Sequence, residues 1–134
     1  MITLEKAQEA LKASEAKAKE LGIAVSSAIV DEYGVLMAFS RMDGALKVSP
    51  KFSQAKAQTS AALGLPSGEV ANFAGEGKAY VGVNVAFAGE MMVIAGGLPV
   101  KHNGQIVGAI GVGGSLDVNQ DVACAQAAKN VLEA

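Results

Sequence analysis

The sequence predicts an α+β fold in which an antiparallel sheet lies between two layers of helices. Two pairs of apolar runs, over residues 23–42 and 93–112, have the pattern of β-hairpins, and helical patterns stand before, between and after them. The run Gln105–Val112 is apolar on both faces and has no clean polar side. A strand of this kind is covered on both faces. We therefore expect a three-layer sandwich with the second hairpin at its centre.

The central hairpin is predicted from a turn between two apolar runs. Val93–Val100 and Gln105–Val112 flank His102-Asn103-Gly104. Asn-Gly is the strongest short hairpin signal, because a type I′ turn needs positive φ at both central residues. Glycine inside a strand marks a bulge or a close approach by a ligand or another backbone. Six glycines crowd this hairpin: Gly96, Gly97, Gly108, Gly111, Gly113 and Gly114.

The first part of the chain predicts a helix followed by the other hairpin. Apolar residues recur at helical spacing over Leu4–Leu21, Thr3 begins this helix, and Gly22 follows as a C-terminal cap. Ile23–Val30 and Val35–Met42 each alternate between two faces. Gly34 closes the turn between them with a left-handed residue. The order so far is helix, strand, strand.

The middle of the chain predicts two more helices and one unassigned segment. Ser49 as the N-cap and Pro50 at the first helical position begin a helix that runs to about Leu63. A shorter helix spans about Ser67–Phe73. Residues 75–89 are punctuated by glycine, and a short helix and a mobile loop both remain open there.

The last element is a closing helix over about residues 118–132. Asp117 and Gln120 have the spacing of a capping box, in which two side chains satisfy the free N–H groups of the helix start. Gly111–Ser115 precedes this helix and offers free N–H groups near its positive end. Such a turn can hold an anion. It is not a dinucleotide-binding fingerprint, because Leu116 stands where the third glycine belongs.

Composition limits the class of protein. Residues 1–134 have the length of a single domain. A net charge of −2 without a basic cluster argues against nucleic-acid binding. No apolar run is long enough for a membrane helix, and the single Cys124 fits a reducing compartment, so we expect a cytoplasmic protein with no signal peptide. The apolar fraction is 51% although aromatic residues make up only 4%, and the chain is rich in the small residues Ala and Gly, which predicts a homo-oligomer.

Arg41 and Asp43 end an otherwise apolar strand. Arg41 alternates in step with Phe39 and Met37, so it should point to the same layer as those two side chains. A half-buried guanidinium must be paired, and Asp43 is the nearest partner in sequence. A structural ion pair and an anion-binding arginine are both open at this point.

Other reactive side chains favour structural interpretations. His102 is the only histidine, so no histidine pair exists for a metal site, and it stands at a turn where exposure is expected. Cys124 lies among alanines and is expected to be a buried, inert thiol. Lys56 belongs to the helix that ends at Leu63, and the simplest interpretation places it on the solvated edge of that helix.

Several motifs together resemble the GlcG/HbpS family, which includes the C-terminal domain of PduO-type proteins. They cover essentially the whole chain and are Ile29-Val30-Asp31-x-x-Gly34, Arg41-Met42-Asp43-Gly44-Ala45, Ser53-x-x-Lys56-Ala57, Gly96-Gly97-Leu98-Pro99, Gly108-Ala109-Ile110-Gly111-Val112-Gly113-Gly114 and Asp121-x-x-Cys124-Ala125. The resemblance implies a profilin-like fold, with helices on both faces of a five-stranded antiparallel sheet, and a homo-oligomer.

The resemblance also implies haem as a cofactor, because some members bind haem through a histidine on the first helix. Leu4–Leu21 contains no histidine, so ligation of haem iron would need His102, a tyrosine or a methionine. The polar and glycine positions that recur in the family are the expected ligand-binding residues. They are Arg41, Asp43, Lys56, Gly96, Gly97, Gly113 and Gly114.

Two hypotheses for function remain open. In the first, the protein is an oligomeric binding module for haem, a related tetrapyrrole or another small anionic ligand. In the second, it is a small catabolic enzyme or enzyme accessory acting on a small organic acid or carbonyl compound. Arg41 would then hold a substrate carboxylate, and Asp43 or Lys56 would act as the acid or base. The second hypothesis requires a cleft with converging polar groups.

Overall fold

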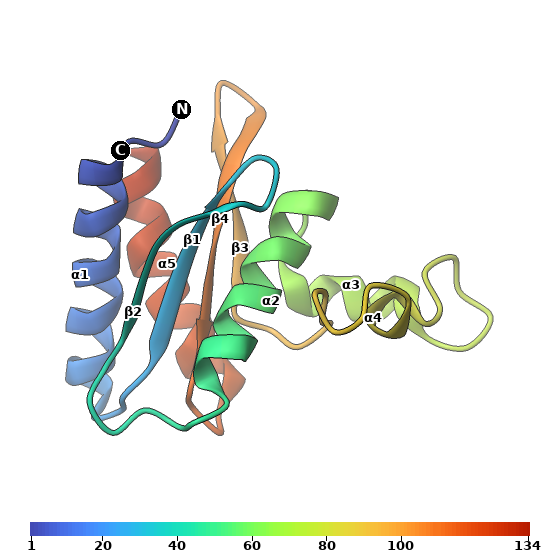
Figure 1. Cartoon of the computed structure of the whole chain (residues 1–134), viewed down its shortest axis with the longest axis horizontal. Helices are drawn as coiled ribbons and strands as arrows, with labels where there is room; N and C mark the ends of the chain where they lie inside the picture. The colour runs from blue at the N-terminus through green and yellow to red at the C-terminus, as the bar shows by residue number, and fades with distance from the viewer.

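The computed structural model describes residues 1–134 as a four-stranded antiparallel sheet between two helical layers. The strand order is β2-β1-β4-β3. Helices α1 and α5 cover one face and α2 covers the other (Figure 1), so the predicted three-layer arrangement is confirmed. The elements are α1 (Leu4–Leu21), β1 (Ser26–Asp31), β2 (Leu36–Arg41), α2 (Ser49–Leu63), α3 (Ser67–Ala74), α4 (Val83–Ala86), β3 (Gly97–His102), β4 (Gln105–Gly113) and α5 (Val118–Glu133).

The expectation of a fifth strand is wrong. That expectation came from the family resemblance, since only four strands are predicted from the residue pattern. The segment between α3 and β3 forms turns and the short helix α4, and it projects from the body of the molecule (Figure 1). Three of its glycines have φ between 76° and 82°, a left-handed conformation that interrupts an extended strand: Gly77, Gly82 and Gly89. We call residues 75–91 the arm. No helix of the chain is both long enough and apolar enough to cross a membrane.

Local signals placed several element ends correctly. The hydroxyl of Thr3 accepts a hydrogen bond from the N–H of Lys6, and Gly22 ends α1 at φ 74°. Asn103 and Gly104 both have positive φ, 51° and 77°, so the predicted turn between β3 and β4 is confirmed. The left-handed glycine predicted in the first hairpin, Gly34, has φ 79°.

Two predicted helix caps differ from the structure. Val48, not Ser49, is the N-cap of α2, and the hydroxyl of Ser49 donates to the carbonyl of Leu46 at 2.6 Å. The same hydroxyl lies 2.8 Å from that of Ser26 on β1, which is buried and needs a polar partner. At α5 the side chain of Asp117 accepts from the N–H of Asn119 as expected. The reciprocal bond of a capping box is missing, because the Gln120 side chain accepts a hydrogen bond from the Ser115 hydroxyl instead.

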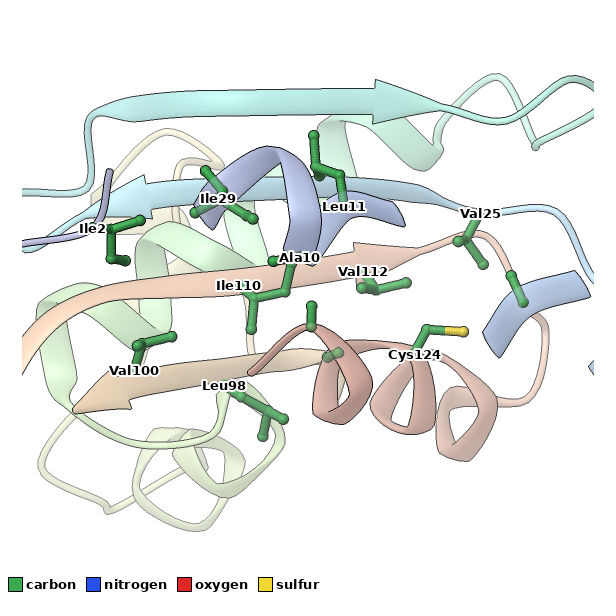
Figure 2. Close-up of a cluster of buried hydrophobic side chains, with 14 residues drawn as sticks. Ile2, Ala10, Leu11, Val25, Ile29, Leu98, Val100, Ile110, Val112 and Cys124 are labelled. Carbon is green, nitrogen blue, oxygen red and sulfur yellow. The ribbon is translucent and has the colours of Figure 1, made fainter. Parts of the chain in front are cut away.

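The main core lies between the sheet and the α1–α5 layer. Figure 2 shows Ile29, Ile110 and Val112 of the sheet meeting Leu11 of α1 and Cys124 of α5. Both isoleucine side chains are fully buried. Burial of one such side chain stabilises the fold by roughly 1.5–3 kcal/mol. This layer therefore supplies most of the apolar burial of the chain.

The opposite face brings α2 unusually close to the sheet. A Cβ at Gly111 would overlap the carbonyl oxygen of Ser53, and a Cβ at Gly113 would lie 2.9 Å from the Cβ of Phe52. The smaller apolar cluster on this face consists largely of alanines, including Ala57 and Ala109. Gly111 and Gly113 are therefore explained by the close approach of α2 to the sheet, which is one of the reasons for glycine predicted from the sequence.

Candidate functional site

Lys56 and Asp121 form a buried ion pair that joins the two helical layers. Lys56 lies on α2 and is only 1% exposed, which contradicts its expected place on a solvated helix edge. Its Nζ lies 3.2 Å from Oδ2 of Asp121 on α5, and it donates to the carbonyl of Val112 at 2.9 Å. The N–H of Ser115 donates to the other carboxylate oxygen at 3.0 Å. Each buried charge therefore has a partner of opposite charge and a further hydrogen bond.

Two of the four expected glycines, Gly96 and Gly97, lie against Lys56. A Cβ at Gly96 would lie 2.8 Å from Nζ of Lys56, and a Cβ at Gly97 would overlap the carbonyl group of Lys56. Gly113 and Gly114 link the Val112 carbonyl to the Ser115 N–H. The structure thus places Gly96 and Gly97 against Lys56, whereas Gly113 packs against Phe52 and Gly114 against the backbone of Ala24. All four glycines lie against protein atoms rather than a cavity, since none of them lines any of the four surface pockets.

Burial controls the protonation of this region. It lowers the pKa of Lys56 and raises the pKa of Asp121, and the attraction between the two groups opposes both shifts. The adjacent Cys124 has its pKa raised to about 11, first by burial and then by the charge of Asp121. The thiol is therefore protonated at neutral pH, which agrees with the expected buried, inert cysteine.

Arg41 and Asp43 do not form the ion pair that was one of the two open interpretations. One guanidinium nitrogen of Arg41 donates to the carbonyl of Ala45 at 3.2 Å, and neither residue takes part in any of the four ion pairs of the chain. The expectation of one common layer for the β2 side chains is also wrong. Phe39 packs on the α2 side of the sheet, whereas Met37 packs against the opposite core, because a bulge in β2 shifts the alternation.

Arg41 and Asp43 instead line a groove between α1 and the edge strand β2. It consists of two pockets of about 340 and 350 Å³ that share Glu15. We call it the α1–β2 groove, and its lining is Gln8, Leu11, Lys12, Glu15, Lys19, Ser40, Arg41, Met42 and Asp43. The Ser40 hydroxyl is shielded from solvent and has no hydrogen-bond partner. A buried polar group without a partner is uncommon, and here it lies beside a hollow that a ligand can fill.

A second groove runs along the outward face of α2. Two pockets of about 240 and 220 Å³ share Gln58 and Glu90 there. We call it the α2 groove, lined by Glu32, Tyr33, Gly34, Lys51, Gln54, Ala55, Gln58, Ala62, Phe87, Ala88, Gly89, Glu90 and Met91. It was not predicted from the sequence. The only part of this groove that the sequence could have indicated is its α2 face, because Lys51, Gln54, Gln58 and Ala62 have helical spacing. The two walls come from segments far apart in the sequence, so no local pattern indicates that they meet.

The only histidine lies away from both grooves. His102 ends β3 next to the Asn-Gly turn and is exposed, as expected for that position. It lines none of the surface pockets, and α1 carries no histidine. No group of three or more His, Cys, Asp or Glu side chains has the arrangement of a metal site.

Comparison with known proteins identifies the family. A sequence model described as "Haem degrading protein HbpS-like" matches residues 2–130. The chain belongs to this family. The resemblance to GlcG/HbpS proteins seen in the motifs is therefore confirmed.

Three known proteins are similar to this HbpS-like chain over most of their own length. An uncharacterised 15.0 kDa protein from the dhaT–dhaS intergenic region of Citrobacter freundii is 35% identical over 127 residues, which cover 95% of this chain and 89% of that protein. The crystal structure of ORFY from Klebsiella pneumoniae has a TM-score of 0.92 and 34% identity over 98% of this chain and 90% of that one. The crystal structure of a PduOC:haem complex has a TM-score of 0.91 and 27% identity over 97% and 94%.

Proposed function

We propose that this HbpS-like chain binds a small anionic ligand, haem or a related tetrapyrrole, in the α1–β2 groove. The observation that carries the proposal is the set of basic side chains around this groove. Lys12, Lys19 and Arg41 line it, and none of them is in an ion pair. Glu15 and Asp43 also line it, so basic groups exceed acidic ones by one.

The groove has the features that a carboxylate-bearing ligand requires. Arg41 uses one hydrogen bond for the Ala45 carbonyl and keeps the other N–H groups of its planar guanidinium for a carboxylate. Ser40 adds a hydroxyl with no partner in the protein. Leu11 and Met42 provide apolar surface for the body of the ligand. Haem has this combination, with an apolar ring and two propionates.

The groove suits the porphyrin and the propionates but not the iron. No histidine, cysteine or tyrosine lines it, and the sulfur of Met42 already accepts a hydrogen bond from the N–H of Val25 at 3.4 Å. We infer that the ligand is recognised through its carboxylates and ring. Binding of haem through a strong axial histidine, as the resemblance implies for some members, has no counterpart in this groove.

The test compares haem with metal-free protoporphyrin IX by absorbance titration and ultrafiltration. We expect the two ligands to bind with dissociation constants within a factor of about three. The Arg41→Gln variant should weaken both by about tenfold, the amount expected for about 1.4 kcal/mol from a hydrogen bond to a charged group. Lys47→Gln, an exposed neighbour outside the groove, is the matched control.

The results separate the alternatives. Tight binding of haem alone, with a spectrum of histidine ligation that His102→Ala abolishes, would contradict recognition through the carboxylates. No binding of either ligand would contradict the tetrapyrrole proposal. The enzyme hypothesis loses Lys56 as its acid or base, because Lys56 is enclosed with Asp121 and lines neither pocket of this groove. Asp43, which lines the groove with Arg41, is then the acid or base that this hypothesis requires.

A further inference from the structure

The α2 groove is acidic and aromatic at one end, and this end differs in charge and lining from the α1–β2 groove. Its pocket of about 240 Å³ is lined by two acidic residues, Glu32 and Glu90, by two aromatic residues, Tyr33 and Phe87, and by Met91. No lysine, arginine or histidine lines this pocket. The two grooves share no residue, so a ligand bound in this pocket needs nothing from the function proposed above.

The two carboxylates come from different walls and neither has a basic partner. Glu32 lies in the turn between β1 and β2, and Glu90 lies at the end of the arm. Neither residue takes part in any ion pair of the chain, and Lys51, at the other end of the groove, does not approach either of them within ion-pair distance. Two negative charges on opposite walls of one pocket repel each other, and a cation bound between them would offset this electrostatic repulsion.

Both walls are held against α2 by specific contacts. Oδ1 of Asp31 accepts the N–H groups of Tyr33 at 2.8 Å and Val35 at 3.0 Å, which fixes the turn that carries Glu32. A Cβ at Gly34 would lie 3.8 Å from Cγ of Gln58, so the turn rests on the helix. On the other side, the N–H of Met92, next to the arm, donates to the hydroxyl of Thr59 on α2 at 2.9 Å. The pocket is therefore formed before any ligand arrives.

The aromatic rings decide which kind of cation fits. Tyr33 is 83% exposed and Phe87 is 49% exposed, so both rings are open to a ligand. A ring attracts an ammonium group over its face, and this attraction is strongest for cations that shed water easily. An inorganic divalent ion requires more oxygen ligands than two carboxylates supply, and no group of three such ligands is present. We propose that this pocket binds a small organic cation, an ammonium group on a compact apolar body.

The experiment uses choline as the probe and 3,3-dimethylbutan-1-ol as its neutral isostere. Amide chemical shifts of the ¹⁵N-labelled protein are followed during titration with each. We expect choline to move the amides of residues 32–34, 58 and 87–91, and the neutral alcohol to bind at least tenfold more weakly. The affinity for choline should fall further as the salt concentration rises.

Variants assign the effect to the pocket. The double variant Glu32→Gln/Glu90→Gln should lose at least tenfold in affinity for choline, and Tyr33→Leu about fivefold, which corresponds to about 1 kcal/mol for one cation–π contact. All of these side chains are on the surface, so the variants should fold, and their spectra will show it. Glu76→Gln, an exposed arm residue outside the pocket, is the matched control and should change nothing.

Three outcomes would overturn the proposal. One is the absence of shifts with choline at the pocket amides. Another is equal affinity for choline and the neutral alcohol, which would show an apolar hollow without charge recognition. The third is unchanged affinity in the Glu32→Gln/Glu90→Gln variant, which would place the cation elsewhere.

Discussion

Breaking the buried pair from one side should destabilise the protein strongly. Lys56→Met keeps much of the length of the side chain but leaves the buried carboxylate of Asp121 with only the Ser115 N–H. Removing one member of a buried ion pair costs about 3–5 kcal/mol. For a chain of 134 residues, at about 2.1 cal/mol/K per residue of unfolding entropy, this lowers the melting temperature by about 11–18 °C. Asp121→Leu should have an effect of the same size.

Removing both charges should cost less than removing one. In Lys56→Met/Asp121→Leu no unpaired charge remains, and apolar side chains of similar volume replace the pair. Such replacements are often neutral or stabilising. The double variant should therefore melt at a higher temperature than either single variant. The double-mutant cycle should give a coupling free energy of several kcal/mol between Lys56 and Asp121.

The assay is thermal and urea unfolding followed by circular dichroism at pH 7, with Lys51→Met as the control. Lys51 lies on the same helix but is exposed and unpaired, so its replacement should change stability by less than about 0.5 kcal/mol. The expected decrease in the melting temperature of Lys56→Met is about 11–18 °C. A melting temperature within about 3 °C of wild type would refute the reasoning. Strictly additive effects of the two single changes would refute it as well.

Three further expectations concern packing, titration and assembly. Gly111→Ala should cost more than about 3 kcal/mol in urea unfolding, because its Cβ would overlap α2, whereas a Cβ at Gly75 meets only the Lys78 side chain at 3.9 Å, so Gly75→Ala should stay near wild type. Cys124 should not react with a thiol reagent at pH 8 until the protein is unfolded. The pKa of the folded thiol, about 11, lies above the unfolded value of 9.0, so the contribution of the protonated thiol to the free energy of unfolding is present below pH 9 and is lost as the pH rises through 11. Between these two pH values the free energy of unfolding should fall less steeply in Cys124→Ala than in the wild type. Sedimentation should show a species larger than the 13.5 kDa monomer, since the arm leaves apolar rings such as Tyr80 and Phe87 half exposed; a monomer at micromolar concentration would contradict this.

Features that depend on neighbouring residues were predictable from the sequence. The end of α1 at Gly22 and the Asn103-Gly104 turn follow from backbone preferences of one or two residues, and the structure confirms both. The apolar character of β4 on both faces likewise predicted a layer of helices on each side. Local φ preferences and residue periodicity act over a few positions, so they can be recognised without knowing the rest of the fold.

Features that join distant segments were decided by the tertiary structure. Lys56 and Asp121 stand 65 positions apart, and nothing around either residue indicates its partner. The bulge in β2 that moves Met37 to the other face arises from its pairing with β1. Both grooves form between elements that meet only after the layers have packed. The chain by itself therefore determined most of the elements, their ends and the number of layers, whereas charge pairing, the meaning of the glycines and the surface hollows depend on distances between segments that only the packed fold defines.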